Sequence, residues 1–195
     1  MIEPTDIHDF WNWFKVNCNE LHADKYPNNK LAELDRKVTQ FGLRWEVGPG
    51  IDKENSFTIS PNGDKGLINT IKEFISNAPI IASWEFYNFK QPKANWQILE
   101  LPHSNIKITA DNWAYTLLRY KDGKKEILIK GDTLAGIEPD SRIGVVEIVL
   151  TNLLGEEKMM NELDYVDVLD PEDYTYEMHD IQELNEHLDH IKNGA

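Results

Sequence analysis

Two glutamates, Glu46 and Glu85, follow tryptophans in short segments with the composition of β-strands, Trp45-Glu46-Val47 and Trp84-Glu85-Phe86. In a strand, each glutamate points to the face opposite its tryptophan. If the two strands are neighbours, the carboxylates share a face, and their repulsion together with the nearby Arg44 favours one protonated and one ionised group. Such a pair predicts acid–base catalysis of the hydrolase type. The alternative is a set of exposed sheet charges or an Arg–Glu ion pair.

Four carboxylate or imidazole side chains near the C-terminus are spaced three or four positions apart: Glu183, Glu186, His187 and His190. On a helix this spacing brings side chains together, and these residue types can ligate one metal ion. A structural zinc site takes four nitrogen or sulfur ligands, however, and the sequence has neither a cysteine cluster nor a His-Glu-x-x-His motif. The pattern therefore favours a solvated helix face, and we predict no metal or other cofactor.

The remaining reactive residue types lack partners that the sequence can identify. Cys18 falls on the apolar stripe of a predicted helix, where it is most simply a small core residue. His103 lies in a proline-containing loop and could assist a hydrolase site only if the fold brought the glutamates to it. No Gly-x-Ser-x-Gly elbow is present, and the two glycine-rich turns, 48–50 and 63–66, lack the spacing of phosphate-binding loops.

Charge is the strongest global feature of the chain. The 195 residues include 34 acidic and 20 basic side chains, a net charge of -14 that disfavours nucleic acid and anionic membranes as partners. Residues 161–195 contain 11 acidic residues and one lysine, so this segment carries -10. The segment is either a solvated face or a docking surface for a basic protein. The acidic residues that we expect at such a surface are Glu162, Asp164, Asp167, Asp170, Glu172 and Asp173.

Trp13 is the aromatic residue whose position is hardest to explain by one packed face. It belongs to the cluster Phe10-Trp11-Asn12-Trp13-Phe14, whose aromatic side chains surround the predicted first helix. Trp13 lies off the main stripe and needs either a second packing surface inside the fold or a binding partner. We therefore keep it as a candidate binding residue.

The elements that position these residues begin with a predicted helical hairpin. Apolar residues at helical spacing mark helices over 7–21 and 31–41, separated by a proline-containing loop. Two further core helices are predicted over 67–75 and 143–154, the second with Ile143, Val146, Leu150 and Leu153 on its buried face, and an amphipathic helix over 181–191. The predicted strands are 43–47, 57–59, 80–89, 96–99, 106–108, 113–119, 126–130 and 165–169.

The order of these elements favours an α+β fold with a mainly antiparallel sheet. Strands and helices do not alternate regularly, and Asp122-Gly123 between two β-rich runs is a strong hairpin signal. We expect a single domain over residues 1–195, with the acidic segment 161–195 packed on it. A lone cysteine, a start without a basic and apolar leader, and the lack of a membrane-length apolar run predict a cytoplasmic protein.

Several motifs together resemble a family of uncharacterised bacterial proteins, a domain of unknown function. The motifs are Trp45-Glu46-Val47-Gly48, Ile59-Ser60-Pro61-Asn62-Gly63, and Ala78-Pro79 followed after four residues by Trp84-Glu85-Phe86. Phe10-Trp11-x-Trp13-Phe14 and Leu154-Gly155-Glu156-Glu157 add to the likeness, which covers most of the chain. The resemblance implies a bacterial cytosolic domain and identifies no catalytic residue.

Two functional hypotheses follow from the residues. The favoured one is a non-catalytic binding or inhibitory protein, similar to an immunity or adaptor protein, whose acidic surface engages a basic protein. The alternative is a small hydrolase that uses Glu46 and Glu85, with Arg44 or His103 in support. The first depends on charge, and the second requires the two glutamates to converge.

Overall fold

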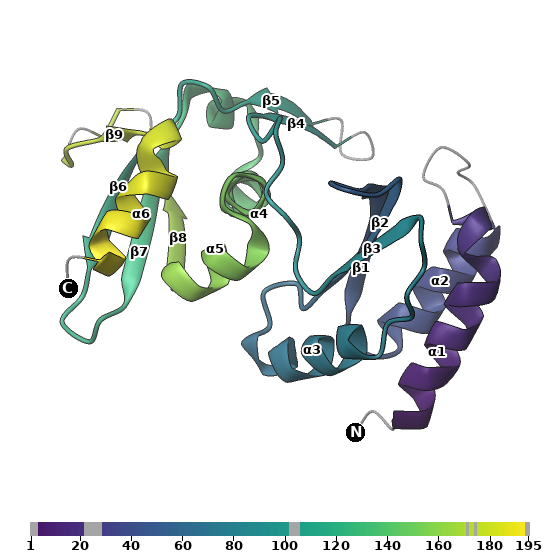
Figure 1. Ribbon diagram of the computed structural model, residues 1–195. Helices are drawn as coiled ribbons and strands as arrows, with labels where there is room; N and C mark the ends of the chain where they lie inside the picture. Colours follow the sequence, from purple (N-terminus) through teal and green to yellow (C-terminus); the bar gives the residue numbers. More distant parts are fainter. Residues whose placement is uncertain (1–3, 22–28, 102–105, 171, 174, 194–195) are drawn as a thin grey trace. The chain divides into compact units, whose positions relative to one another are not determined.

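The computed structural model describes residues 4–21, 29–101, 106–170, 172–173 and 175–193 (Figure 1). The chain divides into two compact units, Met1–Lys90 and Gln91–Ala195, which we call the N-terminal and the C-terminal unit. Helices and mostly antiparallel sheets are combined in an α+β fold, as the sequence predicts. Within the described ranges, no helix has the length and apolar character needed to span a membrane.

The N-terminal unit combines three α-helices with a three-stranded sheet. The helices are α1 (Pro4–Asn17), α2 (Asn29–Thr39) and α3 (Ile68–Ser76), with short 3-10 turns η1 (Cys18–Glu20) and η3 (Lys65–Leu67). The strands are β1 (Arg44–Pro49), β2 (Asn55–Ser60) and β3 (Trp84–Tyr87). β2 is the central strand, antiparallel to β1 and parallel to β3. The predicted first two helices are therefore present as α1 and α2.

Aromatic side chains form the core of this unit. Phe10 and Phe14, four residues apart on α1, lie 5.9 and 4.9 Å from the ring of Phe57 on β2. Phe10 also lies 4.7 Å from Phe74 of α3, and the indole of Trp11 donates a 2.7 Å hydrogen bond to the Phe74 carbonyl. Full burial of such a side chain contributes about 1.5–3 kcal/mol. The aromatic side chains of α1 thus pack against both the sheet and α3.

The predicted long strand over 80–89 is reduced to the four residues of β3. β2 begins at Asn55, whose partner is Trp84, so no neighbouring strand is available to pair with the residues before Trp84. The chain makes a turn there, in which the Trp84 amide donates to the Ile81 carbonyl, and Ile80 is 99% exposed. The prediction for 80–83 was wrong because an apolar run forms a strand only where it finds a partner.

The C-terminal unit contains a two-stranded and a four-stranded sheet. The strands are β4 (Ile98–Leu101), β5 (Ile106–Thr109), β6 (Ala114–Arg119), β7 (Lys125–Lys130), β8 (Tyr165–Val168) and β9 (His179–Asp180). The helices are α4 (Pro139–Leu154), α5 (Glu156–Glu162) and α6 (Leu184–Asn193), with 3-10 turns η5 (Asp132–Gly136) and η6 (Ile181–Glu183). β4 pairs with β5, and the larger sheet has the order β8-β7-β6-β9.

The hairpin predicted around Asp122-Gly123 is present as β6 and β7. Arg119 pairs with Lys125, and Gly123 takes the positive φ of 87° that a tight turn requires. β8 lies parallel to β7 because the chain returns through α4 and α5 before it pairs. The parallel edge strand therefore follows from the two intervening helices.

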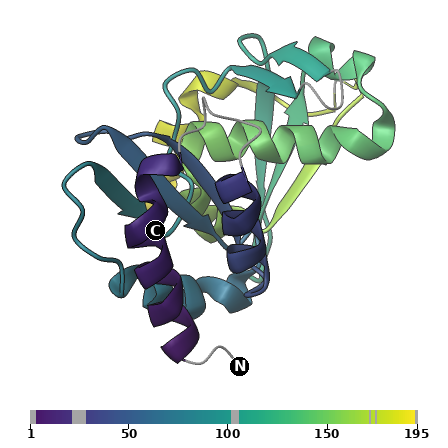
Figure 2. The same ribbon diagram turned by 90° about the vertical axis from the view of Figure 1, so that its right-hand side faces the viewer.

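The helix α4 packs on one face of the four-stranded sheet (Figure 2). Its buried apolar side chains are Val145, Val146, Val149, Leu150 and Leu154, which belong to the same core as Ile127 and Ile129 of β7. The predicted face is partly wrong, since Ile143 is 43% exposed and Leu153 is only partly buried. The segment is apolar on most sides, so periodicity alone did not define one inward face.

Alternate side chains of β7 point to opposite faces of this sheet, one facing the core and one facing away from it. Ile127 and Ile129 point into the core, so Glu126, Leu128 and Lys130 point to the opposite face. Tyr165 of β8 is the register partner of Glu126 and shares that outer face. The register therefore places an exposed tyrosine beside a glutamate, although the two are distant in the sequence.

Candidate functional site

The structure does not bring Glu46 and Glu85 together. β2 lies between their strands, where Glu46 is opposite Thr58 and Glu85 is opposite Ser56. Both glutamates lie on the same face, as predicted, but two strand spacings of about 4.8 Å each separate them across the sheet. Arg44 is exposed at the start of β1, and His103 lies outside the described residues. The hydrolase hypothesis therefore lacks the convergence on which it depends.

Glu85 instead anchors the loop between β1 and β2. Its carboxylate accepts hydrogen bonds from the backbone amides of Ile51, Asp52 and Lys53 at 2.6–2.8 Å, and from the Tyr87 hydroxyl at 2.5 Å. The Tyr87 hydrogen bond and then the amides lower the pKa of Glu85 to about 2. Burial and the neighbouring carboxylate raise the pKa of Tyr87 to about 12. These contacts hold the β1–β2 loop and engage both carboxylate oxygens of Glu85, so they do not support proton exchange with Glu46.

The C-terminal helix does not assemble a metal site from its described residues. Glu183, Glu186 and His190 are exposed, whereas His187 is half-buried and shares a 2.7 Å hydrogen bond with the hydroxyl of Tyr115. Across the described ranges, no group of three or more His, Cys, Asp or Glu residues is arranged to hold a metal ion. His187 therefore connects α6 to the sheet through Tyr115.

Trp13 packs against its own unit. The Phe10 ring lies 6.2 Å from it, and the Lys37 ammonium lies 5.3 Å above the indole. α2 thus supplies the second packing surface that the position of Trp13 requires. The side chain is half-buried, and these contacts explain it without a partner.

The acidic segment is used partly inside the C-terminal unit. Glu162 is only 8% exposed and forms an ion pair with Lys125, so it is no docking residue. Asp164 accepts a 3.0 Å hydrogen bond from the Lys125 amide. Hydrogen bonds from Thr175 lower the pKa of Asp173, which is half-buried. The predicted residues that remain exposed are Asp164, Asp167, Asp170 and Glu172.

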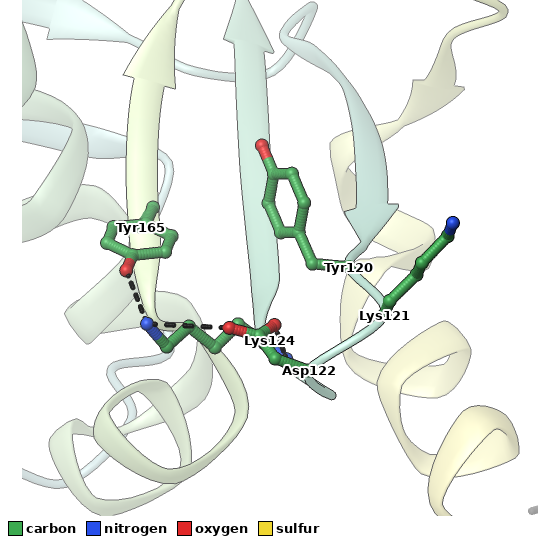
Figure 3. A pocket seen from close by; sticks show the side chains of 5 residues that line it. All are labelled: Tyr120, Lys121, Asp122, Lys124 and Tyr165. Atoms are coloured by element: carbon green, nitrogen blue, oxygen red, sulfur yellow. Dashed lines mark hydrogen bonds and ion pairs between the residues drawn. The ribbon is translucent and has the colours of Figure 1, made fainter.

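A hollow of about 600 Å³ lies where the β6–β7 turn meets the start of β8. It is lined by Tyr120, Lys121, Asp122, Lys124 and Tyr165 (Figure 3). Figure 3 shows the rings of Tyr165 and Tyr120 on either side of β7, with Lys124 and Asp122 at the turn and Lys121 directed away from both rings. The two rings are 47% and 45% exposed. The hollow is therefore an open site with two accessible aromatic rings.

A lysine already occupies one side of this hollow. The Lys124 ammonium donates a 2.9 Å hydrogen bond to the Tyr165 hydroxyl, and it lies 5.4 Å from the centre of that ring. The Asp122 carboxylate is 3.6 Å from the same ammonium. The Tyr165 hydrogen bond and these charges raise the pKa of Lys124, so the side chain is a persistent cation. Tyr165 thus interacts with a cation within its own unit.

Tyr120 connects the hollow to the outer face of the sheet. Its hydroxyl donates a hydrogen bond to Glu126, and this bond is the main reason that its pKa is raised. Tyr120 and Tyr165, which are 45 residues apart in the sequence, line the same hollow. We call Tyr120 and Tyr165, with Asp122, Lys124 and Glu126, the tyrosine surface.

Sequence reasoning missed this surface. Tyr120 follows the last residue of β6, and Tyr165 begins β8, the strand predicted over 165–169. Their proximity depends on the parallel pairing of β7 with β8, which a hairpin signal does not reveal. The one available clue was the concentration of tyrosines around the acidic segment, at 165, 174 and 176.

Comparison with known proteins finds no family model, curated protein or solved structure that matches this chain. The tyrosine surface must therefore be interpreted from its own geometry. It offers aromatic rings, phenol hydroxyls and carboxylates in an open hollow, which suits recognition of a surface group on another molecule.

Proposed function

We propose that this chain is a non-catalytic, cytoplasmic binding or inhibitory protein that engages a basic protein through the C-terminal unit. The observation that carries the proposal is that Tyr120 and Tyr165 line one open hollow, with rings that are 45% and 47% exposed, beside the carboxylates of Asp122 and Glu126. Tyrosine is among the residue types that dominate binding energy in protein interfaces. The aromatic rings supply the contact, and the acidic residues select the charge of the partner.

The charge distribution supports a basic partner. The C-terminal unit contains 21 acidic and 10 basic residues, a net charge of -11, whereas the N-terminal unit carries -3. Asp167, Asp170 and Glu172 are exposed and follow Tyr165 in the sequence. An aromatic centre with a charged rim is the usual anatomy of a protein interface, and the rim accelerates association with a partner of opposite charge.

The competing hydrolase function has less support. It requires two carboxylates that share a proton across a small gap. β2 separates Glu46 from Glu85, and Glu85 is engaged by three amides and a phenol. The tyrosine surface, in contrast, contains accessible groups without any rearrangement of the sheet.

The experiment is capture of binding proteins from the native organism on immobilised protein, followed by direct affinity measurement with the purified partner. Asp167→Asn with Asp170→Asn is expected to weaken binding about tenfold at low salt, because two favourable charges are lost. The matched control is Asp9→Asn with Glu73→Gln, which removes the same charge from exposed positions of the N-terminal unit. A partner that is acidic, or that binds both variants equally, would contradict the proposal.

A further inference from the structure

We propose that Tyr120 and Tyr165 clamp an arginine side chain of the partner beside Glu126, and that Lys124 is the resident cation that this arginine displaces. The inference rests on the proposed binding function and names the group that anchors the partner. The relevant geometry is confined to the turn after β6 and the first residues of β7 and β8.

The position of Lys124 shows that this hollow accepts a cation. Its ammonium lies 5.4 Å from the centre of the Tyr165 ring and donates to the phenol oxygen at 2.9 Å. Aromatic faces attract cations within about 6 Å of the ring centre. The Tyr165 ring nevertheless stays 47% exposed, so the lysine covers only part of it. An entering cation can replace the ammonium on the same ring.

One carboxylate, Asp122, lines the hollow, and a second, Glu126, neighbours the two ring residues; both favour a cation over an anion. Asp122 lies 3.6 Å from the Lys124 ammonium and offsets its charge. Glu126 is the register partner of Tyr165, and one of its oxygens accepts from the Tyr120 hydroxyl. An anion would meet these two carboxylates and a unit of net charge -11. A cation would instead pair with Glu126 while it contacts the rings.

Arginine fits this arrangement better than lysine does. A guanidinium is planar, carries five donors and stacks on aromatic faces, whereas an ammonium is a compact and strongly hydrated point charge. The hollow of about 600 Å³ is open enough to admit a flat side chain between groups that stand on either side of β7 (Figure 3). The rings would contact the guanidinium plane, and Glu126 would accept from its edge.

The test uses the whole chain of residues 1–195 and three capped hexapeptides: hexa-arginine, hexa-lysine and the neutral isostere hexa-citrulline. Affinities are measured by calorimetry at low salt, and the tyrosine ring resonances are followed by NMR. We expect hexa-arginine to bind about two- to fivefold more tightly than hexa-lysine, in line with an exposed cation–π contact. Hexa-citrulline should not bind, and the ring signals of Tyr120 and Tyr165 should shift with hexa-arginine.

Removal of the resident cation provides the sharpest comparison. Lys124→Met should tighten hexa-arginine binding about two- to fivefold more than Lys121→Met does. Both variants remove one positive charge from the same turn, but Lys121 points away from the two rings (Figure 3). Tyr120→Leu with Tyr165→Leu should abolish the preference for arginine over lysine, with circular dichroism as the check on folding.

The outcomes separate this inference from the proposed function. The arginine clamp would be overturned by equal binding of hexa-arginine and hexa-lysine, or by equal effects of Lys124→Met and Lys121→Met. In that case, a basic partner whose binding weakens with salt would still support the proposed acidic docking surface. Weaker binding in Lys124→Met would also overturn it, since the lysine would then be a contact rather than a competitor. Loss of every basic partner and of both cationic peptides would overturn both proposals.

Discussion

Glu85 is the residue whose environment differs most from its sequence-based interpretation. Its carboxylate holds three consecutive loop amides and the Tyr87 hydroxyl. Glu85 lies on the edge strand β3, separated from Glu46 by β2, and its hydrogen bonds fix the β1–β2 loop. The sequence suggested either an acid–base pair with Glu46 or an exposed sheet charge, whereas the partners in the structure are three backbone amides and the Tyr87 hydroxyl.

Glu85→Gln should lower the melting temperature at neutral pH, because the amide offers one acceptor oxygen and no charge to the loop. The pKa of Glu85 is lowered from 4.5 to about 2, so its contribution is present above about pH 4.5 and is lost as the pH falls toward 2. The difference between wild type and variant should therefore shrink across that range. Thermal unfolding from pH 7 to pH 2 measures this, with the exposed Glu54→Gln as control. A constant difference would show that the charge is irrelevant.

The Lys125–Glu162 ion pair gives a second prediction at the residue scale. Its side chains are 17% and 10% exposed, so Glu162→Gln leaves a poorly solvated ammonium and should cost about 3 kcal/mol in the free energy of unfolding. The pair Lys107–Glu100 is the control, since its side chains are 76% and 55% exposed. Glu100→Gln should cost less than about 1 kcal/mol. Chemical denaturation measures the cost of each substitution. Similar costs for Glu162→Gln and Glu100→Gln would contradict the conclusion that burial makes the Lys125–Glu162 pair important.

At the scale of elements, the β6–β7 hairpin positions the tyrosine surface. Its register places Arg119 opposite Lys125, which fixes the turn that carries Tyr120 and Lys124. β8 then adds Tyr165 beside Glu126 in parallel. A shift of either strand by one residue would send Tyr165 or Glu126 to the core face.

Gly123→Ala should destabilise the C-terminal unit by about 1 kcal/mol, because Gly123 has a φ of 87° that an L side chain rarely adopts. Space is not the cause, since an added Cβ would meet no atom within 4 Å. Gly144→Ala is the matched control in α4, where an added Cβ also meets nothing. It should stabilise by about 0.5–1 kcal/mol through helix propensity. Equal signs for the two variants in denaturation experiments would contradict this explanation.

At the scale of the whole molecule, the charge is divided unevenly between the two units. The C-terminal unit carries -11 of the -14, and part of this charge is paired internally through Lys125 and Lys158. The exposed remainder produces a field that attracts cationic molecules before contact. Association should therefore depend on ionic strength more than dissociation does.

Stopped-flow measurement with fluorescently labelled hexa-arginine tests this dependence. Between 0.01 and 1 M salt the Debye length falls from about 30 Å to about 3 Å, so the association rate constant should fall at least tenfold. The dissociation rate constant should change by less than about threefold. A salt effect confined to dissociation would indicate that local contacts, and not the field of the unit, control binding.

The α+β class, the first two helices and the β6–β7 hairpin were predictable because each depends on neighbours in the sequence. Helical spacing defines the stripe of α1, and Asp122-Gly123 specifies a turn. The error at 80–83 and the partly wrong face of α4 have one origin. Apolar character alone does not say whether a partner strand is present or which side of a helix is covered.

The type of most helices and strands and the concentration of negative charge in residues 161–195 follow from the amino-acid sequence alone. Which of these charges are exposed depends on the three-dimensional packing, since Glu162 is buried beside Lys125 where α5 contacts β7. The structure also decided that β2 separates Glu46 from Glu85, and that Tyr120 and Tyr165 meet around β7. Local pattern fixes what each segment is, whereas strand order and register fix which side chains become neighbours.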